Sequence, residues 1–90
     1  MLLNMIIHLG NDIYITKNDI IGIFDLDNST VSKHTRNYLK KAQDRDEIIT
    51  INSELPKSFI LTSKNKKNNI YLSQLASSTL LKRYNNYLKF

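Results

Sequence analysis

Hydrophobic residues lie along the chain in short continuous runs separated by polar turns, and at helical spacing in two longer stretches. The runs are rich in β-branched residues, which is typical of strands. They occupy residues 5–9, 12–16, 20–24, 47–51, 58–63 and 70–72. Helical spacing begins at Thr30 and again at Ser77 or Ser78, the second stretch running as far as Tyr87. The pattern predicts an α+β domain over residues 1–90, with about six short strands and two helices in the order β-β-β-α-β-β-β-α.

The turn after the first strand predicts a tight hairpin. Gly10-Asn11 is a two-residue hairpin signal, because both residues tolerate a positive φ. In such a hairpin Leu9 faces Asp12 and Ile7 faces Tyr14, which makes both of its faces apolar. The third strand is also apolar on both sides. Two helices do not easily cover a sheet of this kind, so we expect either neighbouring subunits against one face or a sheet curled around a single core.

The helix expected from Thr30 has an apolar side and a positive side. The apolar side consists of Val31, Thr35, Tyr38, Leu39 and Ala42, and the positive side of Lys33, Arg36, Asn37 and Lys40. Residues able to accept hydrogen bonds from a helix start precede it, namely Asp25, Asp27, Asn28 and Ser29. A solvated helix surface is the simplest explanation of the positive side, so its meaning depends on where the other charges lie.

The last third of the chain predicts a second hairpin and a final helix. The polar segment Lys64–Asn69 separates the last two strands and predicts a long basic tip for this hairpin. Pro56, the only proline, lies in the preceding connection, where its missing donor costs nothing. The final helix has an apolar stripe that we expect to dock on the sheet or on a neighbouring subunit. This stripe consists of Leu80, Leu81, Tyr84 and Leu88.

Charge is distributed unevenly along the chain. Residues 1–54 hold all eight acidic residues and six basic ones, a net charge of −2, whereas residues 55–90 hold seven basic residues and no acid, a net charge of +7. Nucleic acid is favoured over a membrane as the polyanionic partner, because neither helix pairs a basic face with a bulky apolar one. Lys, Asn and Ile all have AT-rich codons, so genome composition accounts for part of the basic character.

The residues of common catalytic and metal sites are scarce. The chain has no cysteine, and its two glycines, Gly10 and Gly22, do not form a phosphate-binding loop. His8 lies in an apolar strand, where a hydrogen-bonded, half-buried histidine is expected, and His34 is expected at the surface. We therefore expect no enzymatic activity, no cofactor, no metal ion and no small-molecule substrate.

We expect no signal for export or membrane insertion in this chain. No apolar stretch approaches the roughly 18–20 residues that span a bilayer, and residues 1–5 lack the basic start and long apolar core of a secretory signal. We expect a cytoplasmic protein without a membrane partner.

Basic residues lie at the expected ends and edges of the elements. Lys17 falls in a turn, Lys33 and Arg36 on the first helix, Lys57 beside the proline, and Lys64–Lys67 in the basic loop. None of the common sequence-reading modules is present. These side chains therefore suit contacts to phosphates, which position a protein on DNA without reading its sequence. Arg36 alone on that helix has the forked guanidinium group that binds phosphate in a bidentate manner.

Four segments resemble a known family. They are His8-Leu9-Gly10, Ile21–Asp25, Pro56-Lys57-Ser58 and, most specifically, Tyr71–Arg83. Together they resemble RemB-like members of the extracellular matrix regulatory (RemA/RemB) family of spore-forming bacteria. The resemblance implies a cytoplasmic, ring-forming homo-oligomer. It also implies DNA binding near matrix-gene promoters through basic residues that are repeated around the ring.

Site residues follow from the resemblance one position at a time. RemA-like members bind DNA with an arginine just after the second strand, and here that position corresponds to Asp19, with Lys17 nearby. Arginines before the fifth strand correspond to Lys57, which keeps the charge and lacks the fork. Asp44-Arg45 matches the pair that closes the first helix in the family, where a structural role and a DNA contact both remain open.

Three functions are consistent with these observations. The first is a DNA-binding transcriptional regulator of extracellular-matrix (biofilm) genes, a ring whose partners are double-stranded DNA and other copies of the chain. Its expected DNA contacts are Lys17, Lys33, Arg36 and Lys57. The second is an oligomeric scaffold or protein-interaction regulator without direct DNA binding, which Asp19 favours. RNA binding is the third, weakened by the lack of exposed stacking aromatic residues on a sheet.

Overall fold

The computed structural model describes residues 6–26, 32–51 and 55–85, and within them it shows two helices and two β-sheets. The strands are β1 (Ile6–Gly10), β2 (Ile13–Thr16), β3 (Ile20–Asp25), β4 (Ile48–Thr50), β5 (Ser58–Lys64) and β6 (Lys67–Ser73). The two α-helices are α1 (Lys33–Asp44) and α2 (Ser77–Asn85), and a 3-10 turn, η2 (Lys17–Asp19), lies between β2 and β3. The predicted α+β class and the order of strands and α-helices are confirmed.

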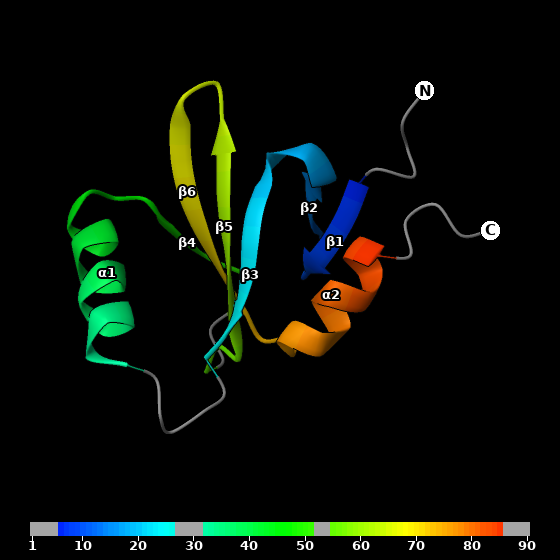
Figure 1. The fold of residues 1–90 in the computed structure, drawn as a ribbon. Coiled ribbons are helices and arrows are strands. Elements are labelled where there is room, and N and C mark those ends of the chain that lie inside the picture. The colour runs from blue at the N-terminus through cyan, green and yellow to red at the C-terminus, as the bar shows by residue number, and fades with distance from the viewer. Residues whose placement is uncertain (1–5, 27–31, 52–54, 86–90) are drawn as a thin grey trace.

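The strands form two sheets where the sequence pattern predicted one. β1 and β2 pair only with each other, while the other four strands form a sheet in the order β3-β5-β6-β4. β5 is antiparallel to both of its neighbours, and β4 lies parallel to β6. In Figure 1 α1 lies on one side of the four-stranded sheet, and α2 and the β1–β2 hairpin lie on the other. The chain therefore covers both faces of this sheet with its own elements.

The predicted register of the first hairpin is wrong by one residue. The turn is Asn11-Asp12, both with positive φ (50° and 65°), and Gly10 (φ 110°) remains in β1. Ile7 pairs with Ile15, and a β-bulge follows between His8 and Gly10. The shifted register places Ile13 and Ile15 of β2 on the same face as Ile7 and Leu9, and all four pack in the core, so the predicted apolar groups on the two faces are rearranged.

A second bulge rearranges β3. It lies between Ile20 and Gly22, so Ile20 and Ile23 both pack against the core on the α2 side, whereas the alternating pattern had placed them on opposite faces. Phe24 stacks on Phe59 with ring centroids 4.8 Å apart. Ile21 is 62% exposed and Phe24 44% exposed. The apolar character of this strand thus extends to the protein surface.

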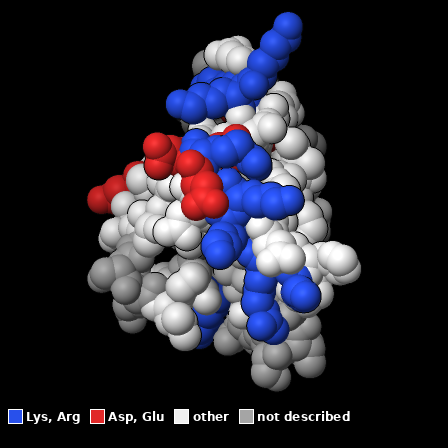
Figure 2. Space-filling model, turned by 90° about the vertical axis from the view of Figure 1, so that its left-hand side faces the viewer, with Lys and Arg blue, Asp and Glu red and all other residues white. Residues whose placement is uncertain are grey.

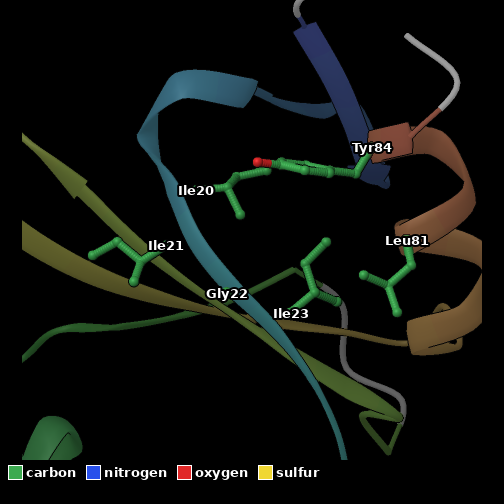
Figure 3. A pocket seen from close by; sticks show the side chains of 6 residues that line it. All are labelled: Ile20, Ile21, Gly22, Ile23, Leu81 and Tyr84. Atoms are coloured by element: carbon green, nitrogen blue, oxygen red, sulfur yellow. The ribbon is translucent and has the colours of Figure 1, made fainter.

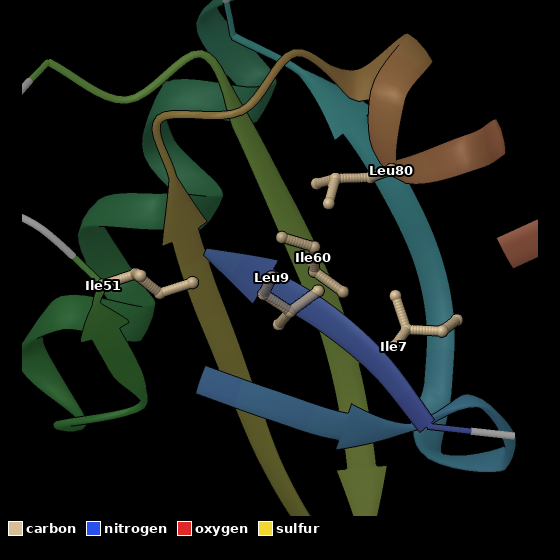
Figure 4. Close-up of a cluster of buried hydrophobic side chains, with 5 residues drawn as sticks. All are labelled: Ile7, Leu9, Ile51, Ile60 and Leu80. Atoms are coloured by element: carbon tan, nitrogen blue, oxygen red, sulfur yellow. The ribbon is translucent and has the colours of Figure 1, made fainter. Parts of the chain in front are cut away.

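Two clusters of buried side chains lie on opposite faces of the four-stranded sheet. The cluster on the α2 side contains Ile7, Leu9, Ile51, Ile60 and Leu80 (Figure 4). The cluster on the α1 side contains Ala42, Phe59 and Ile70. The β5 run Phe59-Ile60 serves both clusters, because successive strand residues point to opposite faces. Of the predicted α2 stripe, Leu80 is fully buried, Leu81 is 43% exposed, and Leu88 lies outside the described residues.

Buried hydroxyl groups tie the first hairpin to the larger sheet. The Ser73 hydroxyl donates to the Leu9 carbonyl oxygen at 2.8 Å and accepts from the Leu75 amide at 3.0 Å. The Ser58 hydroxyl donates to the Leu75 carbonyl oxygen at 2.8 Å. Because buried polar groups need partners, these bonds hold the segment before α2 against the end of β1.

Helix α1 begins later than predicted. Its N-cap is Ser32, whose hydroxyl accepts a hydrogen bond from the Thr35 amide at 3.1 Å. Of the acceptors expected to cap it, Asp25 belongs to β3, and residues 27–29 lie outside the described part of the chain, as does Thr30. Tyr38 on the predicted apolar side is 41% exposed, whereas Ala42 is buried.

The other end of α1 closes with a Schellman motif. The amides of Asp46 and Glu47 donate to the carbonyl oxygens of Gln43 (3.0 Å) and Ala42 (2.9 Å), and Asp46 has a φ of 57°. Arg45 forms an ion pair with Glu47, Nε to Oε2, at 3.2 Å. These contacts favour a structural role for Arg45 of the Asp44-Arg45 pair.

Candidate nucleic-acid interface

The positive side of α1 forms one part of the candidate interface. Lys33, Arg36, Lys40 and Lys41 are all exposed on this helix. Spacings of three and four residues bring Lys33, Arg36 and Lys40 onto one side of a helix. Figure 2, which views the molecule from the α1 side, shows Lys and Arg side chains in a long column with Asp and Glu on one flank. The column offers several cations to an extended polyanion.

Lys57 lies next to this helix. Arg36 and Lys40 line a groove together with Pro56, and the exposed Lys57 follows that proline directly. The Lys57 backbone is held on both sides, because its amide donates to the Ser73 carbonyl oxygen and its carbonyl oxygen accepts from the Leu26 amide, each at 2.8 Å. The folded chain thus brings Lys57 close to the basic side of α1.

Lys17 lies at the other end of the sheet. It belongs to η2, which precedes β3, whereas Lys57 precedes Ser58, the partner of Asp25 at the far end of β3. A six-residue strand separates the two ends by about 20 Å. The Lys17 Nζ atom lies 4.4 Å from the centroid of the Tyr84 ring, a cation–π contact that helps to hold α2. The four predicted DNA contacts are therefore divided between two ends of the molecule.

The β5–β6 hairpin is longer than predicted. Its strands continue to Lys64 and Lys67, and the turn consists of Asn65 and Lys66 alone. The expected six-residue basic loop is therefore wrong, because the polar residues pair as strands. Lys64, Lys66 and Lys67 are exposed at the end of a two-stranded ribbon. The sequence indicates that these lysines suit phosphate contacts, although they are not among the four expected DNA contacts.

Asp19 takes part in a polar hollow at the base of this hairpin. The hollow is lined by Tyr14, Thr16, Asp19, Lys64 and Tyr71, among others. The carboxylate therefore lies at the same end of the sheet as the hairpin lysines, where it opposes their charge. Asp19 thus reduces the positive potential at the position where the family is expected to carry an arginine.

Two apolar grooves flank β3, an edge strand of the four-stranded sheet. The groove on the α2 side, shown in Figure 3, is lined by Ile20, Ile21, Gly22, Ile23, Leu81 and Tyr84. The groove on the α1 side is lined by Phe24, His34, Thr35, Tyr38, Phe59 and Leu61. Edge strands with exposed apolar side chains are candidates for contacts with other chains.

The histidines and acidic residues give no catalytic arrangement within the described ranges. His8 is half-buried as predicted and stacks on Tyr14 with ring centroids 4.6 Å apart. Its buried Nε2 atom has no hydrogen-bond partner among the described residues. His34 is exposed as predicted. In residues 6–26, 32–51 and 55–85 no three His, Asp or Glu side chains form a group that could hold a metal ion.

Membrane crossing by a helix is also not indicated. Neither α1 nor α2 is long and apolar enough to cross a bilayer, and they are the α-helices of the described chain.

The described residues define a small α+β domain with a basic face and an apolar sheet edge. The family described as RemA-like, extracellular matrix regulatory protein A-like, matches residues 6–84, from β1 to α2. The chain is also 39% identical over 79 residues to extracellular matrix regulatory protein B of Bacillus subtilis (strain 168), covering 88% of this chain and 89% of that protein. The chain therefore belongs to the RemA-like family of extracellular matrix regulatory proteins, as a RemB-like member.

Proposed function

We propose that this protein is a DNA-binding transcriptional regulator of extracellular-matrix (biofilm) genes that acts in the cytoplasm as a ring-shaped homo-oligomer. The column of cations on the α1 face is the observation that carries the DNA-binding part of the proposal. The B. subtilis relative, named an extracellular matrix regulatory protein, supports the choice of target genes.

The proposed DNA contacts are electrostatic. Lys33, Arg36 and Lys57 bind phosphates on the α1 side, and Lys17 adds a contact at the other end of the sheet. Each neutralised phosphate releases counterions, so the slope of log affinity against log salt changes by about −0.9 per contact. Two or three such contacts bind weakly in one subunit. A ring that repeats them along a duplex gains by effective concentration.

The proposed oligomer is supported by the exposed apolar residues around β3. Ile21, Phe24 and Leu81 are 62%, 44% and 43% exposed, and they border the two grooves beside this edge strand. A second copy that covers this edge removes these side chains from water. Because a heterologous contact of this kind produces either a ring or an open filament, a closed ring is the form that limits growth.

A salt titration with duplex DNA tests the proposal. We expect the affinity of the wild-type protein to fall steeply with salt concentration. Lys33→Ala and Lys57→Ala should each weaken binding and flatten the slope of log affinity against log salt by about 0.9. Lys82→Ala, on α2 and away from the α1 face, removes the same charge and serves as the control. Equal effects of all three substitutions would indicate that net charge alone matters. Undetectable binding of the wild type at low salt would refute the DNA-binding role.

The apolar grooves beside β3 also favour a second candidate function. An oligomeric scaffold that binds a protein partner would use the same exposed residues and the basic rim without contacting DNA. Asp19 at the expected arginine position agrees with this function. A wild-type protein that forms the oligomer and binds no duplex DNA would favour the scaffold.

A further inference from the structure

The end of the β5–β6 hairpin extends beyond the strands on either side of it. β3 pairs with β5 only as far as Thr62, and β4 begins to pair with β6 at Ile70. Past these positions the ribbon consists of the pairs Ser63–Asn68 and Lys64–Lys67 and a two-residue turn. We call residues Ser63–Asn68 the hairpin tip. Figure 1 shows it standing clear at one end of the sheet.

The lysines of the hairpin tip work against the hairpin itself. Lys66 occupies a turn position with a φ of 66°, where glycine or asparagine is favoured and a lysine is strained. Lys64 and Lys67 are directly opposite each other, and like charges at such a pair are destabilising. Neither feature helps the protein to fold. A polyanion bound to the hairpin tip would neutralise these charges, so a binding role accounts for lysines at both positions.

The size of the tip decides which polyanion fits. Two strand pairs and the turn extend about 10 Å beyond the sheet, and the major groove of B-form DNA, about 12 Å wide and 8.5 Å deep, admits a two-stranded ribbon. The major groove of an RNA duplex is too narrow for side chains to read. A membrane is disfavoured because the tip, SKNKKN, has no apolar residue to insert.

We propose that the hairpin tip enters the major groove of duplex DNA. Lys66 and Lys67 bind the phosphates at the groove walls, and the Asn65 amide faces the base edges, where an asparagine pairs with the N6 and N7 atoms of adenine. Lys64, opposite Lys67, lines the polar hollow with Asp19, whose carboxylate opposes its charge, and contributes less. The inference rests on the proposed DNA-binding function and adds an element that reads sequence.

Two substitutions separate DNA binding from folding. Lys66→Gly creates the Asn-Gly pair that suits this turn, and Lys67→Thr replaces a like charge with a residue that favours strands. We expect both variants to keep or raise the melting temperature. At 0.1 M salt each should lose roughly eightfold in affinity per engaged hairpin, with the slope flattened by about 0.9. Lys82→Thr on α2 is the control and should bind as the wild type does.

The groove is tested separately by dimethyl sulfate footprinting, since guanine N7 lies in the major groove and adenine N3 in the minor groove. We expect the wild type to protect guanine N7 atoms from methylation. Asn65→Gly keeps the turn and should lower the ratio of affinity for selected sites to affinity for random duplexes. Protection of adenine N3 alone would overturn the inference. So would a wild type that binds DNA while Lys66→Gly and Lys67→Thr bind equally well, a result that leaves the proposed function intact. A wild type that binds no DNA refutes both the hairpin-tip inference and the proposed DNA-binding function.

Discussion

The hydroxyl of Ser73 joins the first hairpin to the larger sheet, and its removal measures the strength of that connection. Ser73 is fully buried, and so is Leu9, whose carbonyl oxygen accepts its hydrogen bond. Ser73→Ala leaves this carbonyl oxygen and the Leu75 amide without the partner that each has now. The substitution removes one atom and creates almost no cavity. Its effect therefore comes from the two lost hydrogen bonds.

The expected loss of stability can be worked from these two groups. A buried polar group left without a partner costs about 1–3 kcal/mol, and the Leu75 amide lies nearer the surface than the Leu9 carbonyl. We expect Ser73→Ala to lower the free energy of unfolding by about 2–3 kcal/mol. The whole domain is worth roughly 5–13 kcal/mol at typical values per residue. A loss of this size lowers the melting temperature by roughly 10–20 °C.

Urea unfolding followed by far-UV circular dichroism measures this loss. Protein concentration must be held constant, because an oligomer is stabilised by mass action. We expect a lower midpoint and an unchanged m-value. Ser63→Ala, in β5, is the matched control and should stay within about 0.5 kcal/mol of the wild type. If Ser73→Ala also stays within that limit, the hydroxyl does not hold β1 in place.

Three further substitutions test local features. A Cβ at Gly22 would lie 2.6 Å from the Phe24 ring, so Gly22→Ala should lower the melting temperature, and adding Phe24→Leu should recover part of the loss. Asp46→Gly should stabilise the protein by about 0.5–1 kcal/mol in urea unfolding, since Asp46 has a φ of 57° at the end of α1, and a destabilised variant would contradict this. Ile21→Asp should reduce the oligomer mass seen by native mass spectrometry without loss of helical signal, since Ile21 is 62% exposed. An unchanged mass would exclude this edge as the contact between copies.

The order of strands and helices could be read from the sequence, because it depends on local periodicity. Runs of β-branched residues such as Ile20–Phe24 favour strands whatever surrounds them. The spacing of Leu39 and Ala42 likewise identified the side of α1 that faces the sheet. Family membership could also be read from the sequence, since the continuous segment Tyr71–Arg83 carries the most specific part of the resemblance. These properties need no knowledge of long-range contacts.

The register and grouping of the strands depended on the tertiary structure. The turn at Asn11-Asp12 put Ile15 in the core, and the bulge in β3 put Ile20 there. A bulge is favourable only when the core has a place for the side chain that it redirects. The split into two sheets has a similar cause. The first hairpin is more stable packed over the sheet with α2 than extending its edge, because it then buries Ile7 and Leu9 against Ile60 and Leu80.

For the candidate interface, the sequence determined which residues are basic, and the fold decided which of them lie together. Lys33 and Arg36 share a helix, so their proximity was predictable, whereas Lys57 joins them because the fold places Pro56 on the wall of the groove beside α1. Lys17 lies at the opposite end of the four-stranded sheet from Lys57, because β3 runs from one to the other. The hairpin lysines lie together at the end of a two-stranded ribbon because β5 and β6 pair as far as Lys64 and Lys67. Charge is a property of single residues, but a binding surface requires charges to be neighbours, and long-range packing decides that.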